Sequence, residues 1–177
     1  MNFPELEPLS PETPDTLRLS QRGILPRSVV ERLLGSGSSG LGYTLPITSG
    51  TAGNPADATT YYAGSAEHAL AWTTETTSGV HRIYVPKTGT ISAVYLYVRI
   101  GGTIGTAENV GLYLRLNDAT DITISATSTW NTADVSVSNN ALTQAVTQSN
   151  FLELKIVTPT WVTNPTSVRF AGTIYID

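Results

Sequence analysis

Alternating apolar and polar residues run through the chain from His81 to its last residue. Successive side chains of a strand point to opposite sides, so alternation of this kind predicts a strand with one buried face. Within residues 91–100, the predicted buried face carries Val94, Leu96, Val98 and Ile100. The predicted outward face carries Tyr95, Tyr97 and Arg99.

Five further stretches repeat this pattern, and they cover residues 109–117, 121–126, 132–138, 150–157 and 167–176. Gly, Asn, Asp, Ser or Pro residues lie between them, which is typical of turns, and no helical pattern intervenes. We therefore expect an all-β fold, an antiparallel β-sandwich of jelly-roll-like type. Residues 41–79 are rich in Thr, Ala and Gly and predict loops with one or two short strands. Their pattern leaves open whether they belong to the sandwich.

The N-terminal part of the chain differs in character. Residues 1–16 mix prolines with acidic residues, which disfavours both a helix and a central strand and predicts an extended arm. Residues 17–34 are more apolar and contain the one predicted helix, from Pro26 to Leu34. Such a short helix is marginal alone in water and needs a surface to dock on.

The Gly/Ser run over residues 35–40 predicts a flexible hinge. We therefore divide the chain into an anchor arm with a short helix, residues 1–40, and a β-sandwich head domain, residues 41–177. No fixed-period repeat or heptad pattern is present, so the sequence predicts no fibrous stalk between the two.

Composition narrows the range of partners. Charged residues make up 14% of the chain, and the net charge is −4 without a cluster of Lys or Arg. This excludes the basic patch that nucleic acid or an anionic membrane surface would require. No apolar run approaches the roughly 20 residues of a membrane span, so we expect no membrane insertion. The first residues lack a basic and an apolar region, so we expect no signal peptide and synthesis in the cytoplasm.

Candidate chemistry is sparse, and we expect no enzyme activity and no cofactor. The two histidines, His68 and His81, lack the spacing of a metal site, and no G-x-S-x-G motif occurs. The glycines of residues 101–105 lie between two predicted strands, which favours a hairpin loop over a phosphate-binding loop. Asp118 and Asp121 could offer oxygen ligands to calcium, but turn formation explains them more simply, so we predict no metal site.

Aromatic residues are the more informative candidates. Those in predicted loops are Tyr61, Tyr62, Trp72, Trp130 and Trp161. They could stack on sugars, or they could close the ends of the sandwich or fill a subunit interface, and we favour the second interpretation. A further set on the outward faces of predicted strands comprises Tyr95, Tyr97, Tyr113 and Tyr175. So many exposed tyrosines favour packing against identical copies.

Two stretches, VPKTGTISAVYLYVRIGGTIGTAENVGLYLRLND and WVTNPTSVRFAGTIYID, resemble the terminal β-sandwich domains of tailed-bacteriophage virion proteins. Such domains occur on head fibres, decoration proteins and tail-fibre tips. The resemblance covers residues 81–177 and lies in the strand pattern and in the turn sequences between strands. It implies a homotrimer, a place on the virion surface and no active-site residues.

The absence of a predicted stalk favours a capsid-surface decoration or short head-fibre protein over a long tail fibre. In this hypothesis the arm binds a capsid or other virion protein through its apolar residues, or the arms bind one another around a threefold axis. These residues are Leu17, Leu19, Ile24, Leu25, Val29, Val30, Leu33 and Leu34. Two alternatives stay open: a receptor-binding tail-fibre tip that recognises host polysaccharide, and a carbohydrate-binding module.

Overall fold

The computed structural model describes residues 16–20, 23–26, 42–49, 52–64, 72–74 and 81–177. The chain divides into two compact units, Met1–Leu41 and Gly42–Asp177. The division falls one residue after the boundary expected from the Gly/Ser run.

In the N-terminal unit the described residues form a two-stranded antiparallel sheet. Strand β1 (Thr16–Ser20) pairs with β2 (Gly23–Pro26), with Leu17 opposite Leu25. This hairpin was not predicted, although four of the proposed anchor residues lie on it, namely Leu17, Leu19, Ile24 and Leu25. Pro26 ends β2, and the rest of the predicted helix lies outside the described residues, together with Val29, Val30, Leu33 and Leu34.

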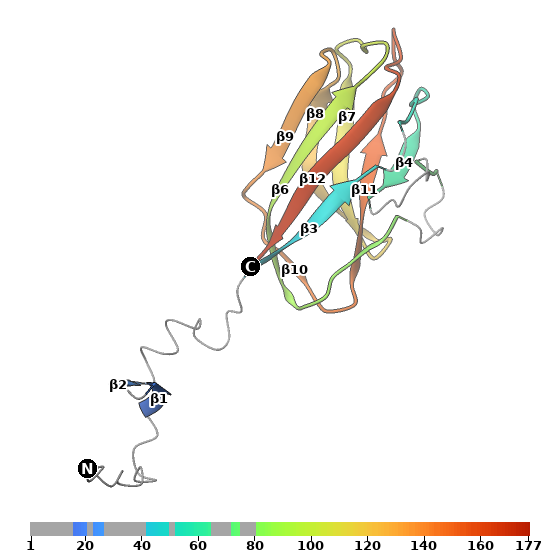
Figure 1. Cartoon of the computed structure of the whole chain (residues 1–177). Coiled ribbons are helices and arrows are strands. Elements are labelled where there is room, and N and C mark those ends of the chain that lie inside the picture. The colour runs from blue at the N-terminus through green and yellow to red at the C-terminus, as the bar shows by residue number, and fades with distance from the viewer. Residues whose placement is uncertain (1–15, 21–22, 27–41, 50–51, 65–71, 75–80) are drawn as a thin grey trace, which may run out of the picture. The chain divides into compact units, whose positions relative to one another are not determined.

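The second unit is a sandwich of two antiparallel sheets, as the alternation predicted (Figure 1). Sheet I is built on β6 (Gly89–Ile100), which pairs with β12 (Val168–Ile176), which in turn pairs with the edge strand β3 (Tyr43–Thr48). The other side of β6 pairs with β9 (Asp134–Asn139) and β10 (Gln144–Val146).

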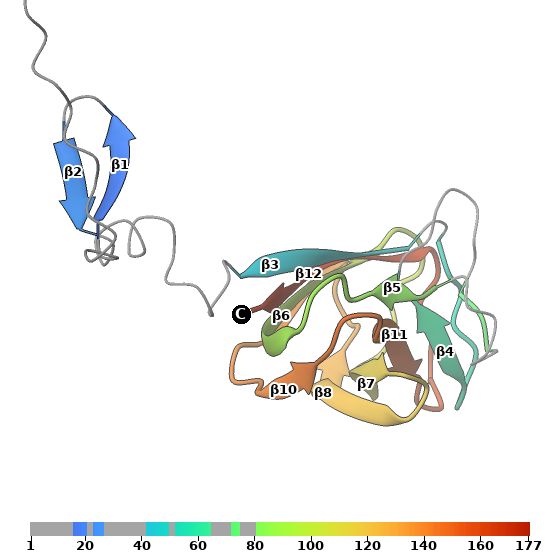
Figure 2. The ribbon, with the colours of Figure 1, turned by 90° about the horizontal axis from the view of Figure 1, so that it is seen from below.

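Sheet II is built on β11 (Phe151–Val157) and β7 (Asn109–Leu116), with β8 (Thr120–Thr129) on the far side of β7. The other side of β11 pairs with β4 (Thr60–Ala63) and β5 (Ile83–Tyr84). Figure 2 shows the two layers, with β3, β12 and β6 in one and β11, β7 and β8 in the other. Residues 42–49 and 52–64 therefore belong to the sandwich, because they supply an edge strand to each sheet.

The core lies between the inward faces of the two sheets. Fully buried aliphatic side chains come from both, including Ile47, Ile91, Val98 and Ile174 of sheet I and Leu112, Leu114, Leu152, Leu154 and Ile156 of sheet II. Burial of one such side chain is worth roughly 1.5 to 3 kcal/mol. The apolar positions of the alternation are thus the residues that face the opposing sheet.

Strand β6 contains one irregularity, at Ser92. Tyr175 pairs with Ala93 and Ile176 pairs with Ile91, so Ser92 is an extra residue opposite β12. A bulge of this kind shifts the alternation by one position, which places Ile91 and Val94 on the same, buried face. It also separates the part of β6 that pairs with β10 from the part that pairs with β9.

Gly172 of β12 lies against the backbone of β6, and we expect Gly172→Ala to destabilise the sandwich. A Cβ at this position would lie 2.5 Å from the carbonyl oxygen of Tyr95. The two strands would have to separate locally, at a cost of about 1 to 3 kcal/mol. Urea unfolding measures this loss. Gly101→Ala is the matched control, because its Cβ would meet no atom closer than 3.5 Å, and an equal loss in both variants would contradict the explanation.

Candidate binding face on sheet I

The outward face of sheet I gathers tyrosine and hydroxyl side chains from neighbouring strands. Register places Ser138 of β9 opposite Tyr95 of β6, and Tyr95 opposite Thr173 of β12. The next outward row joins Ser136, Tyr97 and Ala171 in the same way. Because outward residues of paired strands lie side by side, three segments distant in sequence form one continuous surface.

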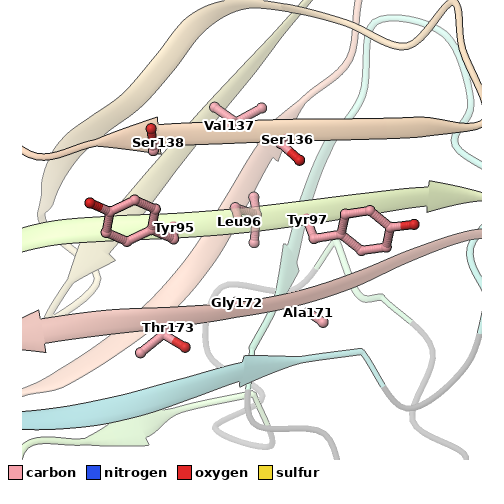
Figure 3. Close-up of a pocket in the computed structure, with 9 residues that line it drawn as sticks. All are labelled: Tyr95, Leu96, Tyr97, Ser136, Val137, Ser138, Ala171, Gly172 and Thr173. Carbon is pink, nitrogen blue, oxygen red and sulfur yellow. The ribbon is translucent and has the colours of Figure 1, made fainter.

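Between these two rows the surface is hollowed into an open depression of ≈ 390 Å³. Its outward lining consists of Tyr95, Tyr97, Ser136, Ser138, Ala171 and Thr173. Leu96, Val137 and Gly172 complete it. Figure 3 shows the two tyrosine side chains on β6, with the serines on β9 to one side and Ala171 and Thr173 on β12 to the other. All of these residues are uncharged.

Each tyrosine has a partner that limits its movement. Tyr95 is 48% exposed, and its ring meets that of Tyr175 edge to face at 5.6 Å between centroids. Tyr97 is 42% exposed and donates a hydrogen bond from its hydroxyl to Asp134 Oδ1. This hydrogen bond raises the pKa of Tyr97 and lowers the pKa of Asp134, so the hydroxyl stays protonated. Both rings are therefore positioned before any ligand arrives.

One ion pair borders the depression. Arg99 Nη1 donates to both carboxylate oxygens of Asp134, at 2.6 and 2.7 Å. The hydrogen bonds to this carboxylate raise the pKa of Arg99. The two charges neutralise each other, so the surface around the tyrosines presents no net charge from this pair.

The loop aromatics that were candidates for sugar stacking lie elsewhere, inside the sandwich. Trp130 and Trp161 are buried, and Tyr61 and Trp72 are half-buried. Trp130 packs against Trp72, Trp161 and Phe170, with centroid separations of 6.5, 5.9 and 5.7 Å. Tyr62 is also buried and lies under the guanidinium of Arg115. In these positions the rings contribute to packing, and the buried Trp130 and Trp161 offer no open ring face to a ligand.

The outward face of sheet II carries charged side chains beside its tyrosines, and Lys155 Nζ lies 5.6 Å from the ring centroid of Tyr113. Arg82 pairs with Asp118 at 2.7 Å and stacks on the ring of Phe151, 4.0 Å from its centroid. Arg115 donates to Asp121 at 2.8 Å and to the carbonyl oxygen of Asp118 at 2.7 Å. Asp118 and Asp121, whose oxygens could have served calcium, are thus paired with cations. The described residues contain no group of three or more His, Cys, Asp or Glu that could hold a metal ion.

Glu153 lies within this charged cluster and is only 1% exposed. Burial, reinforced by the nearby charge of Asp118, raises the pKa of Glu153 to about 7 despite the opposing effect of Arg82. Neither of its carboxyl oxygens accepts a hydrogen bond from a described donor. A protonated Glu153 would fit this environment, because burial of an ionised carboxylate is costly.

Two comparisons with known proteins give no relative. No family model matches the chain, and no curated protein matches it. In the part of the chain that the structure describes, no helix is long and apolar enough to cross a membrane.

Proposed function

We propose that this chain is a non-catalytic structural protein of a tailed-bacteriophage virion, a capsid-surface decoration or short head-fibre protein. Its N-terminal unit attaches to a capsid or other virion protein, and its β-sandwich is displayed on the particle surface. The proposal rests on the resemblance of residues 81–177 to terminal domains of such proteins and on the division of the chain into two units.

The observation that carries the proposal is that the sandwich has a complete core of its own. Among the residues whose burial the structure describes, the buried hydrophobic core runs from Leu45 to Ile176, inside the unit Gly42–Asp177. Because Met1–Leu41 forms a compact unit separate from this one, we propose that the head folds without the first 41 residues. We propose that these residues attach the chain to another protein, because they include apolar residues that such a contact would bury.

Attachment would follow from burial of the apolar arm residues against a virion protein or against arms of other copies. Each Å² of apolar surface removed from water contributes roughly 25 cal/mol. In a homotrimer, which we propose on the resemblance alone, three arms joined through one assembly would bind with much greater avidity than a single arm. Weak individual arms would then suffice for lasting attachment.

Deletion of residues 1–41 tests this proposal. We expect the remaining head to stay folded, with an unfolding transition close to that of the full chain, and to lose binding to particles. The measurement is co-sedimentation with particles purified from the phage that encodes the chain after its own copy has been removed. A truncated head that still sediments with the particles would show that the arm is not the anchor.

A further inference from the structure

The outward face of sheet I has the form of a binding platform. Strand β6 is paired on both sides along the depression, with β9 on one edge and β12 on the other. Side chains on such a strand are held more precisely than side chains on a loop. The depression of ≈ 390 Å³ is within the usual range for ligand sites, about 300 to 1,000 Å³.

The chemistry of the lining fits a sugar. Tyr95 and Tyr97 offer apolar ring surface, to which the C–H bonds of a pyranose ring are complementary. Ser136, Ser138 and Thr173 add hydroxyl groups, which can both donate and accept hydrogen bonds, as the hydroxyls of a sugar require. An aromatic surface with a few polar groups beside it is a common arrangement in small-molecule sites.

The uncharged lining of the depression favours a neutral ligand. None of the residues that line the depression is charged, and the neighbouring Arg99 is already bound by Asp134. The exposed Arg169 lies opposite Arg99 in the next outward row, so an acidic polymer would meet a further cation beside the depression but none in its lining. The preset positions of Tyr95 and Tyr97, held by Tyr175 and Asp134, reduce the entropy lost when a ligand binds.

The shape disfavours a twofold dimer formed through this face. In a twofold dimer the same patch would meet itself, so a hollow would face a hollow. A stable interface buries about 800 Å² on each partner with close complementarity, which two facing depressions do not supply. A ligand narrower than a protein surface fills such a depression better.

From this geometry we infer that the outward face of sheet I binds a neutral oligosaccharide, with pyranose rings stacked on Tyr95 and Tyr97 and hydrogen bonds to hydroxyls of β9 and β12. This site is distinct from the buried loop aromatics. It goes beyond attachment through the N-terminal unit and does not depend on it.

The test is titration of the full-length chain with hexamers of glucose, mannose, galactose and N-acetylglucosamine, followed by isothermal calorimetry and NMR. We expect at least one hexamer to bind, with a dissociation constant of about 0.1 to 1 mM, and to shift the signals of β6, β9 and β12. Tyr95→Ala and Tyr97→Ala should each weaken binding about tenfold. Tyr97→Phe keeps the ring and should lose much less. An oligogalacturonate of the same length should bind no better than the neutral hexamers.

Tyr84→Ala is the matched control, because Tyr84 is also exposed but lies on β5 of sheet II. The sugar affinity of this variant should equal that of the parent chain. Failure of all four neutral hexamers to bind would overturn the inference, as would binding that Tyr95→Ala and Tyr97→Ala leave unchanged. Concentration-dependent self-association that these variants abolish, without any sugar binding, would assign the face to a second copy. None of these results would affect the particle-binding test of the deletion variant.

Discussion

Replacement of Trp130 by alanine is expected to lower the free energy of unfolding by about 3 to 5 kcal/mol, more than any other single substitution that we propose. Trp130 is fully buried and packs against Trp72, Trp161 and Phe170. Alanine would leave a cavity among three rings that belong to different segments. Urea unfolding of the full chain, followed by circular dichroism, measures the loss.

Trp130→Phe provides a graded comparison for this prediction. The indole N–H of Trp130 has no hydrogen-bond partner among the described residues, so phenylalanine removes ring volume and no existing hydrogen bond. We expect less than half the loss seen with alanine. Val162→Ala, at a position that is 83% exposed, should change stability by less than about 0.5 kcal/mol. A loss below about 1 kcal/mol for Trp130→Ala would contradict the central role given to this ring.

The second large effect concerns pH and Glu153. The pKa of Glu153 is raised to about 7 in the folded chain, whereas an unfolded glutamate titrates near 4.3. Between these values the folded state holds a proton that the unfolded state has released. The stabilisation from protonated Glu153 is therefore fully present below the pKa of the unfolded glutamate. It is lost as pH rises toward the folded-state pKa of about 7, and the free energy of unfolding falls by up to about 3 kcal/mol.

Glu153→Gln should remove this pH dependence, because glutamine stays neutral and nearly isosteric. We expect the variant to be more stable than the parent at pH 8 and to lose that advantage at pH 5, as measured by urea unfolding across the range. Glu108→Gln is the matched control, since a hydrogen bond from Thr106 lowers the pKa of Glu108 and puts its titration below this window. Parallel curves for the parent and Glu153→Gln between pH 5 and 8 would rule out the proton held at Glu153.

Most strands of the sandwich could be predicted because one face of each strand is buried, so apolar residues recur at every second position. Strand β7 is an example, since Val110, Leu112, Leu114 and Leu116 all face the core as expected. Strands β3 and β4 could be predicted only loosely, because each is short and an edge strand needs few apolar residues to mark it. The bulge at Ser92 was missed, since it interrupts the alternation that identifies the strand.

The candidate site was predictable only in part. Alternation identified Tyr95 and Tyr97 as outward residues. That Ser136 and Thr173 lie beside them depends on the register between paired strands, which could not be predicted from the sequence. The burial of Glu153 was equally hidden. Its position on β11 is an outward one, and it becomes buried among Arg82, Arg115 and Asp118, which come from other segments.

The pairing of β3 also determines how the head would bear mechanical tension. The N-terminal unit is joined to the sandwich just before Tyr43, and β3 holds on to β12 through the pairs from Tyr43 to Thr48. The sugar site that we infer lies on β6, β9 and β12, so force on a particle held to a surface would pass through neighbouring strands of sheet I. Hydrogen bonds between β3 and β12 would be the first to carry that force.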